Sequence, residues 1–266
     1  MKRFIVNSEP DKNGRVYFEG GDYRYLVRVR RLAPGEFFPA LLPGGTEVTV
    51  QVLSVDGRVL TGELVQYKET GNEFPQELLP IEPSTALPPI ILFQALPKSD
   101  KMDLIVRQAA EGSLDEIVPF LSEFTVVKIN NSAHKLARWE RIIKEARQQS
   151  GSMRATMIRQ PVTMDGLLTY WEQIKSKWPD ALGLLFHHLP LAHDSLHGYL
   201  GKRPEAIVIA IGPEGGFSPA EVKRFVAAGF SPFTIGETVL RTETAALYAQ
   251  AAVRVLLLER NSWETN

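Results

Sequence analysis

Residues 205–221, EAIVIAIGPEGGFSPAE, decide the fold class of this chain. The apolar run at 207–211 predicts a buried strand, and a glycine-rich turn leads from it into Ser218-Pro219-Ala220-Glu221. That tetrad is a capping box with proline at the first helical position. A strand, a tight turn and a helix N-terminus in this order place several backbone N–H groups at the carboxyl end of a parallel sheet, where α/β proteins bind ligands.

The glycine-rich turn excludes two common kinds of ligand. Its Gly-Pro-Glu-Gly-Gly-Phe sequence lacks the spacing of a dinucleotide fingerprint, and it lacks the lysine of a phosphate-binding P-loop. The carboxylate of Glu214 would also repel a polyphosphate. The turn therefore predicts a neutral or zwitterionic ligand, with an ordinary strand-to-helix turn as the alternative.

A second motif follows at residues 233–250, FTIGETVLRTETAALYAQ. We expect a strand to end at Gly236, a short loop to carry Val239 and Leu240, and Thr242 to be the N-cap of the next helix. Arg241 and Glu243 beside this helix start are candidate functional groups or, alternatively, a local ion pair. The helix over 245–258 is apolar nearly all round, which predicts burial by its own sheet and also by another subunit.

The chain divides at a proline-rich segment. Residues 1–70 contain short β-type runs separated by glycine turns and one short basic helical pattern, which predicts a small barrel. Residues 71–89 contain five prolines and predict a linker. Residues 90–266 alternate short apolar strands with amphipathic helices, which predicts a mostly parallel sheet covered on both faces. We expect Trp139, Met164 and Trp171 to lie in its core.

Composition narrows the class of protein. The 266 residues are 44% hydrophobic and 23% charged, and no long apolar run predicts a membrane span. The absence of cysteine excludes disulfides, thiolate zinc sites and a cysteine nucleophile, and fits a reducing compartment. The first residues contain no apolar signal region, so a cytoplasmic location is expected.

The net charge of −1 averages over unlike segments. Residues 1–31 contain eight basic and four acidic side chains, and residues 128–159 contain eight basic and two acidic ones. Basic segments of this kind favour a nucleic-acid partner, and solvated helix faces are the alternative. The histidines at 187, 188, 193 and 197 are too loosely spaced to predict a metal site, but His187 follows a strand and is a candidate for the pocket lining.

The two C-terminal motifs together resemble the RsmE family of ribosomal RNA methyltransferases, in the SPOUT superfamily. The stretches MKRFIVN, LVRVRRLAPGE, KMDLIVRQAAEG and RWERIIKEARQQS extend the likeness over nearly the whole chain. The resemblance implies an N-terminal PUA-like β-barrel and a C-terminal SPOUT α/β domain with a trefoil knot. It also implies a homodimer that binds S-adenosylmethionine and methylates N3 of a uridine in 16S rRNA of the small ribosomal subunit.

The resemblance also assigns residues. The predicted cofactor site consists of two loops and the helix start that follows the second, namely Gly212, Pro213, Glu214, Gly215, Gly216, Ile235, Gly236, Val239, Leu240 and Thr242. Methyl transfer to N3 requires loss of its proton and stabilisation of the charge that spreads onto the flanking carbonyl oxygens, which suits the guanidinium of Arg241. Glu243 is predicted either to orient that guanidinium or to accept the proton.

RNA binding is assigned to basic residues of both domains. The predicted phosphate contacts are Arg3, Arg24, Arg28, Arg30, Arg31, Lys135, Arg138 and Arg141. The chain departs from the family pattern at Tyr25, at Pro43, at Gly112-Ser113 and at Phe124, where arginine is typical; these departures bear on the RNA rather than on the cofactor. The alternatives are a non-catalytic RNA-binding or ribosome-assembly factor on the same fold and an α/β enzyme for a small nucleotide.

Overall fold

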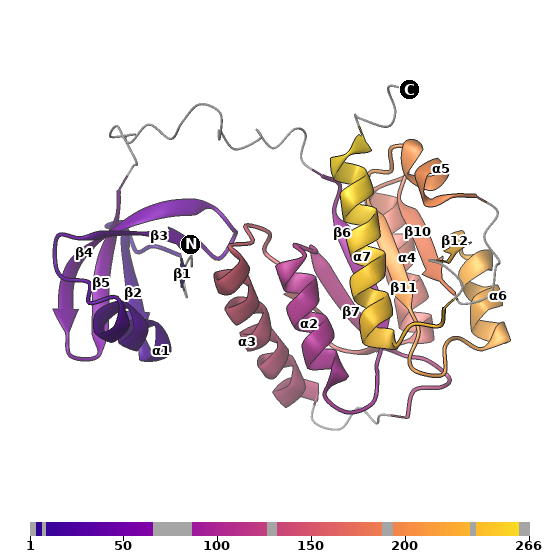
Figure 1. The fold of residues 1–266 in the computed structure, drawn as a ribbon, viewed down its shortest axis with the longest axis horizontal. Coiled ribbons are helices and arrows are strands. Elements are labelled where there is room, and N and C mark those ends of the chain that lie inside the picture. The colour runs from indigo at the N-terminus through magenta and orange to yellow at the C-terminus, as the bar shows by residue number, and fades with distance from the viewer. Residues whose placement is uncertain are drawn as a thin grey trace. The chain divides into compact units, whose positions relative to one another are not determined.

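The computed structural model describes residues 4–6, 9–65, 87–126, 132–187, 194–234 and 238–260. The chain forms two compact units, one of Met1–Ala86 with Arg147–Ala155 and one of Leu87–Ala146 with Thr156–Asn266 (Figure 1). Most of the predicted linker lies outside the described residues, and the predicted boundaries at residues 70 and 89 stay predictions.

The first unit is a five-stranded curled sheet in the order β1-β3-β4-β5-β2. Its strands are β1 (Phe4–Ile5), β2 (Arg15–Glu19), β3 (Phe37–Leu41), β4 (Glu47–Asp56) and β5 (Val59–Val65). Among the described strands of this unit, only the β1–β3 pair is parallel. A register shift between Val52 and Ser54 of β4 adds to the curl, because an extra residue bends the strand.

A short helical segment joins β2 to the rest of this unit. It consists of α1 (Gly20–Tyr23) and the π-helical turn η1 (Arg24–Val29). Leu26 is fully buried among the aromatic core residues of the sheet, whereas Arg24 and Arg28 are exposed. The predicted short basic helical pattern is found as α1 and η1, but Val29, which was expected on its apolar side, is 65% exposed.

The second unit is an α/β structure around a parallel sheet in the order β12-β10-β11-β6-β7-β8, with β9 also pairing with β7. The strands are β6 (Ile90–Ala95), β7 (Glu116–Leu121), β8 (Met157–Ile158), β9 (Val162–Thr163), β10 (Leu182–Phe186), β11 (Ile207–Ile211) and β12 (Phe230–Phe233). All their pairings are parallel. The predicted parallel sheet is confirmed.

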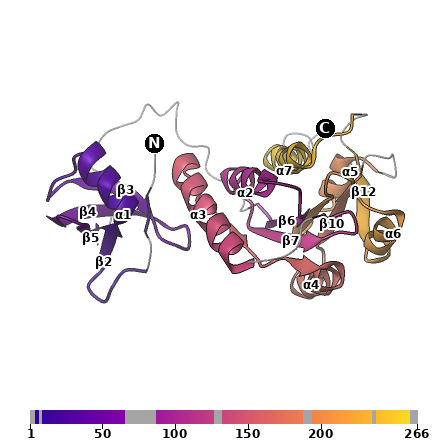
Figure 2. The same cartoon turned by 90° about the horizontal axis from the view of Figure 1, so that it is seen from below.

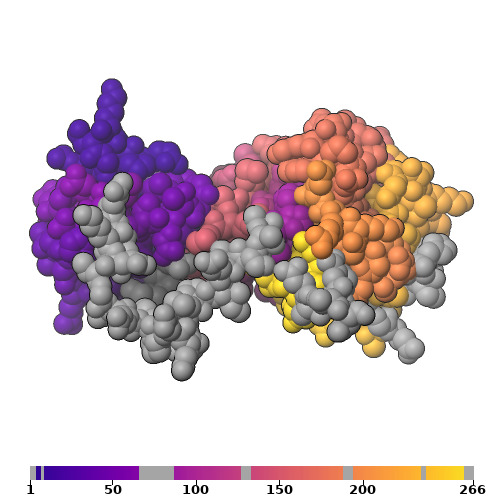
Figure 3. Space-filling view, turned by 90° about the horizontal axis from the view of Figure 1, so that it is seen from above, coloured from indigo at the N-terminus to yellow at the C-terminus, as the bar shows by residue number. Residues whose placement is uncertain are grey.

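Helices cover both faces of this sheet, as Figures 1 and 2 show. One core packs α2 (Lys101–Glu111), α5 (Leu196–Gly201), α7 (Thr242–Leu258) and part of α3 (Ser132–Ser150) against one face. The other core packs α4 (Met164–Lys177) and α6 (Pro219–Ala227) against the opposite face. Helices α5 and α7 contact each other (Figure 3).

Burial on both faces explains why the strands are apolar throughout. Every residue of β6 and β11 is buried. Trp139, Met164 and Trp171 lie in the core as predicted. Among the described residues, no helix is long and apolar enough to cross a membrane, and no cluster of three or more His, Asp or Glu could hold a metal ion.

Candidate active site

A cavity of about 170 Å³ opens where β10, β11 and β12 end. Most of its wall comes from two segments that are far apart in the sequence, the loop after β11 and the residues before α7. The lining residues are Phe186, His187, Ile211, Gly212, Pro213, Glu214, Gly215, Gly216, Phe217, Thr234, Thr238, Val239, Leu240, Thr242 and Ala245. The prediction that His187 lines the pocket is confirmed.

The glycine-rich loop at residues 212–216 is held by the capping box predicted for α6. The hydroxyl of Ser218 accepts a hydrogen bond from the Glu221 amide at 3.2 Å, and the Glu221 carboxylate accepts one from the Ser218 amide at 2.9 Å. Gly216 has a φ of +69°, which favours glycine. A Cβ on Gly212 would lie 3.0 Å from the backbone carbon of Gly216, so the loop closes tightly on itself.

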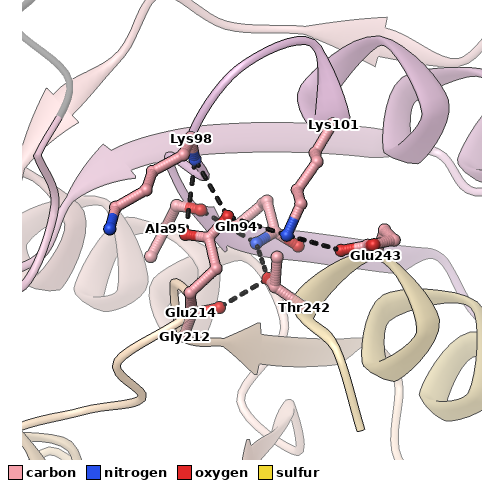
Figure 4. A network of polar contacts seen from close by, with 8 residues as sticks. All are labelled: Gln94, Ala95, Lys98, Lys101, Gly212, Glu214, Thr242 and Glu243. Carbon is pink, nitrogen blue, oxygen red and sulfur yellow. Dashed lines mark hydrogen bonds and ion pairs between the residues drawn. The ribbon is translucent and has the colours of Figure 1, made fainter.

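The start of α7 is tied to this loop by a buried polar network, drawn in Figure 4. The Thr242 hydroxyl donates to the Gly212 carbonyl oxygen at 2.7 Å and accepts from the Gln94 side-chain amide at 3.1 Å (Figure 4). Gln94 is fully buried at the end of β6 and also donates to the Ala95 carbonyl oxygen. The network therefore fixes the two walls of the cavity relative to each other.

Lys101 forms a second tie between the same walls. Its ammonium lies 3.0 Å from Glu214 Oε1 and 3.3 Å from Glu243 Oε2, so one cation at the start of α2 joins both segments (Figure 4). We call Lys101, Glu214 and Glu243 the Lys101 triad. The hydrogen bond to Glu214 raises the pKa of Lys101 above its usual value, although partial desolvation opposes this.

The triad also lowers the pKa of Glu214, the acidic residue of the glycine-rich loop. Partial burial acts to raise the pKa of Glu214, but hydrogen bonds from Lys101 and from the backbone amides of Glu214 and Lys98 outweigh it, so that pKa lies below its usual value. The Lys98 amide donates to Glu214 Oε1 at 3.1 Å. Glu214 therefore stays charged and faces Lys101.

One expectation about the second motif is wrong, and the local ion pair given as an alternative is not found among the described residues. Arg241, not Thr242, occupies the N-cap of α7, and its extended backbone accepts from the Ala245 amide at 2.7 Å. Thr242 is the first residue of the helix, and its hydroxyl donates to the distant carbonyl oxygen of Gly212 instead of capping the helix. Arg241 and Glu243 form no ion pair with each other in the described part of the chain; Glu243 pairs with Lys101, and the exposed Arg241 side chain contacts no other described residue through a hydrogen bond.

The structure brings together most of the predicted cofactor residues. Eight of the ten line the cavity, namely residues 212–216, Val239, Leu240 and Thr242. Ile235 and Gly236 lie outside the described residues. Gln94 and Lys101 were not predicted, although both carried a signal: Gln94 is polar in an apolar strand, and Lys101 places a positive charge at a helix N-terminus, where the helix dipole disfavours it.

Some of the predicted RNA-contacting residues form ion pairs within the protein, and others are exposed. Arg24, Arg28 and Arg31 are exposed in the first unit, and Arg3 lies outside the described residues. On α3, Arg138 pairs with Asp103 and Arg141 lies 3.9 Å from Glu145. A shallow basic groove remains there, lined by His134, Lys135, Ala137, Arg138 and Arg141.

The donor set of the cavity suits an uncharged ring and a zwitterion better than a phosphate. The cavity is lined by glycine backbone groups, by the apolar side chains of Leu240 and Phe186, and by one carboxylate. Among the described residues, no arginine or lysine lines it. These groups fit S-adenosylmethionine, whose adenine can be read by backbone amides and whose amino acid part carries both charges.

Residues 84–254 match the family model described as an RNA methyltransferase domain, and the parallel sheet with its cavity lies within this range. Among curated proteins, ribosomal RNA small subunit methyltransferase E of Synechocystis is 32% identical over 257 residues, which cover 96% of this chain and 78% of that protein. The Bacillus subtilis protein of the same name is 26% identical over 88% of this chain and 87% of its own length. This chain belongs to the ribosomal RNA small subunit methyltransferase E family, the RsmE family.

Solved structures agree in fold. Ribosomal RNA small subunit methyltransferase E from Neisseria gonorrhoeae, bound to S-adenosyl methionine, superposes with a TM-score of 0.75 at 26% identity over 96% of this chain and 98% of that one. A putative methyltransferase from Legionella pneumophila in complex with SAM superposes with a TM-score of 0.72 at 25% identity over 96% and 98%.

Proposed function

We propose that this chain transfers a methyl group from S-adenosylmethionine to N3 of a uridine in 16S rRNA of the small ribosomal subunit. The observation that carries the proposal is the cavity between the glycine-rich loop and the start of α7, in a chain of the RsmE family. Two solved relatives with this fold are described as bound to the same cofactor.

The cofactor would be held by backbone and apolar groups. Backbone amides and carbonyls of residues 212–216 suit the adenine and the amino acid part, and Val239 and Leu240 suit the apolar edge of the ring. Ile235 and Gly236 complete the proposed site. When bound, the cofactor supplies an electrophilic methyl group on a sulfonium sulfur.

Arg241 is the proposed catalytic residue. As N3 of the uracil loses its proton, negative charge spreads onto the two neighbouring carbonyl oxygens, and a guanidinium can donate hydrogen bonds to both. The side chain of Arg241 is exposed beside the cavity and is not held by another described residue, so it is available to a substrate. The proposed role of Glu243 is to hold the Lys101 triad rather than to orient Arg241, because its carboxylate faces Lys101.

We also propose the finer architecture and assembly that the resemblance implies. These are a PUA-like barrel in the first unit, a trefoil knot around the cavity, a cytoplasmic location and a homodimer formed through the C-terminal domain. The exposed apolar residues Val255 and Leu258 of α7 support the homodimer. The proposed RNA contacts are Arg3, Arg24, Arg28, Arg30, Arg31, Lys135, Arg138 and Arg141.

Mass spectrometry of 16S rRNA nucleosides tests the activity. A strain that lacks this protein should lack 3-methyluridine in 16S rRNA, and expression of the wild-type chain should restore it. Unchanged 3-methyluridine in the deletion strain would refute the proposal. Calorimetry with S-adenosylmethionine separates an enzyme from a non-catalytic assembly factor, since the factor would give no heat of binding.

A further inference from the structure

An exposed aromatic ring lies on the glycine-rich loop. Phe124, in the turn that follows β7, is 44% exposed. A Cβ placed on Gly215 would lie 3.1 Å from Phe124 Cβ and 3.4 Å from two of its ring carbons, so the side chain rests against the Cα of this glycine. Phe124 does not itself line the cavity, whereas Gly215 does. One side of the ring is thus supported and much of the rest faces solvent.

The turn that carries Phe124 is held by four hydrogen bonds. The Thr125 amide donates to the Ser122 carbonyl oxygen at 2.9 Å, and the Thr125 hydroxyl accepts from the Ser122 amide at 3.0 Å. The buried carboxylate of Glu221 accepts from the Glu123 amide at 2.9 Å and from the Ser122 hydroxyl at 3.1 Å. Glu221 also completes the capping box of α6, so one side chain holds both the turn and the end of the glycine-rich loop.

We propose that Phe124 is a stacking platform for an unstacked base of the RNA substrate beside the cofactor loop. This inference rests on the proposed function, because an RNA methyltransferase must bring a splayed base close to its cofactor. An aromatic ring held in place loses little conformational freedom when a base stacks on it, and its π-face accepts any base. The ring belongs to the RNA site rather than to the adenine site because the cavity lining excludes it.

Four variants separate stacking from packing. Phe124→Ala removes the ring, Phe124→Leu keeps apolar contact with Gly215 without a π-face, and Phe124→Trp keeps a π-face. Val126→Ala, which removes a 68% exposed side chain from the same segment, is the matched control. Each protein is assayed for methylation of small subunits from a strain that lacks this chain, and its affinity for S-adenosylmethionine is measured by calorimetry.

Loss of one stacked base should lower kcat/KM for the subunit by about 5- to 150-fold in both Phe124→Ala and Phe124→Leu. Phe124→Trp and Val126→Ala should stay within about threefold of the wild type, and all four should keep the wild-type Kd for the cofactor. Wild-type turnover in Phe124→Leu would overturn the proposal. So would a cofactor Kd that rises as much as kcat/KM falls, since Phe124 would then support the loop or the adenine.

Photocrosslinking tests the same contact without turnover. Wild-type protein bound to small subunits is irradiated with short-wave ultraviolet light, which can crosslink any base, and crosslinked peptides are identified by mass spectrometry. A crosslink at Phe124 supports the proposal, and crosslinks confined to other residues overturn it. A wild-type protein that crosslinks at Phe124 but does not methylate would refute the proposed function and leave the stacking platform intact.

Discussion

The two ends of the parallel sheet each have a cavity, and the two cavities use their polar groups differently. The cavity at the amino ends of β6 and β7 is the larger, at about 460 Å³ against about 170 Å³. Its wall contains Asp115, Glu116, Arg159, Tyr170 and Lys177 together with Trp178 and apolar residues. Size and charge alone would therefore point to the wrong end of the sheet.

At the amino end Glu116, Arg159 and Tyr170 satisfy one another. The buried carboxylate of Glu116 accepts a hydrogen bond from the Tyr170 hydroxyl at 2.6 Å and another from Arg159. Arg159 also donates to the Tyr170 hydroxyl at 2.8 Å, and its guanidinium carbon lies 4.1 Å from the centre of that ring. A ligand that used these three groups would have to break bonds that already exist.

At the carboxyl end the polar ties join the two walls of the cavity and leave backbone groups of the glycine-rich loop to line it. Gln94 and Thr242 hold the walls, and the Lys101 triad joins them, while Arg241 remains without a partner among the described residues. The contrast teaches that a ligand site can be identified by polar groups that have no partner within the protein. Four substitutions can break or sharpen this contrast.

Arg241→Ala should have the largest effect. Removal of one donor that stabilises developing charge typically lowers kcat by about 100- to 1,000-fold. Cofactor affinity should change little, because Arg241 does not line the cavity. Arg107→Ala, which removes another exposed arginine of the same unit, should leave kcat unchanged. Near-normal turnover in Arg241→Ala would remove this residue from the mechanism.

Gly212→Ala should weaken the cofactor site itself. The added methyl would lie 3.0 Å from the backbone of Gly216, so the loop must shift. Overpacking of this kind costs about 1 to 3 kcal/mol, which corresponds to an increase of about 5- to 150-fold in the Kd for S-adenosylmethionine.

Gly201→Ala is the control for this substitution. A methyl at Gly201, on the surface of the same unit, would contact nothing within 4 Å. Calorimetry should therefore give the wild-type Kd for Gly201→Ala. An unchanged Kd in Gly212→Ala would show that this loop does not enclose the cofactor.

Sequence patterns predicted the parts of the site that depend on neighbours in the chain. The run at 207–211, the glycine-rich loop and the capping box are local, and all three are confirmed. His187 was expected beside the pocket because it follows a strand, and strand ends meet at one end of a parallel sheet.

The parts that depend on distant partners were not predicted. Gln94 and Thr242 are 148 residues apart, and their hydrogen bond makes Thr242 a tie to Gly212 instead of the expected N-cap. The short spacing of Arg241 and Glu243 suggests that they act on each other, but Lys101 from another helix pairs with Glu243. Local patterns find loops, whereas side-chain partners follow from which strands lie next to each other.

Tyr170→Phe tests the amino end and should affect stability, not binding. Loss of the hydroxyl leaves the buried Glu116 with one donor fewer, which should lower the free energy of unfolding by about 1 to 2 kcal/mol. Cofactor affinity should be unchanged. Tyr248→Phe is the control, because the Tyr248 side chain is exposed and its hydroxyl bonds to no described residue. It should change the free energy of unfolding by less than about 0.5 kcal/mol. A fall in cofactor affinity in Tyr170→Phe would mean that the two ends are coupled.

The same residue predicts a pH dependence. Burial, with the hydrogen bond to Glu116 adding to it, raises the pKa of Tyr170 to about 12 from 10.0. The folded chain therefore keeps a proton that the unfolded chain loses above pH 10, so this contribution is present below pH 10 and lost as the pH rises toward 12. In urea unfolding, the stability difference between wild type and Tyr170→Phe should shrink between these pH values.

Lys101→Met should give the smallest effect and tests whether the triad shapes the cavity. Partly exposed ion pairs contribute little each, so loss of both should raise the cofactor Kd by only about threefold to tenfold. Lys98→Met is the matched control: the Lys98 backbone amide bonds to Glu214, but its side chain points away from the triad in Figure 4, and the Kd should not change.

Salt and pH separate the triad from a loss of packing. Added salt should weaken cofactor binding by the wild type toward the value of Lys101→Met and leave the variant unaffected, because salt screens exposed charges. The pKa of Glu214 lies below 4.5 and that of Lys101 above 10.5, so the ratio of the two Kd values should stay constant across the neutral range. Equal salt dependence in both proteins would show that Lys101 acts through the packing of its aliphatic chain, and the tie between the two walls would then rest on Gln94 and Thr242 alone.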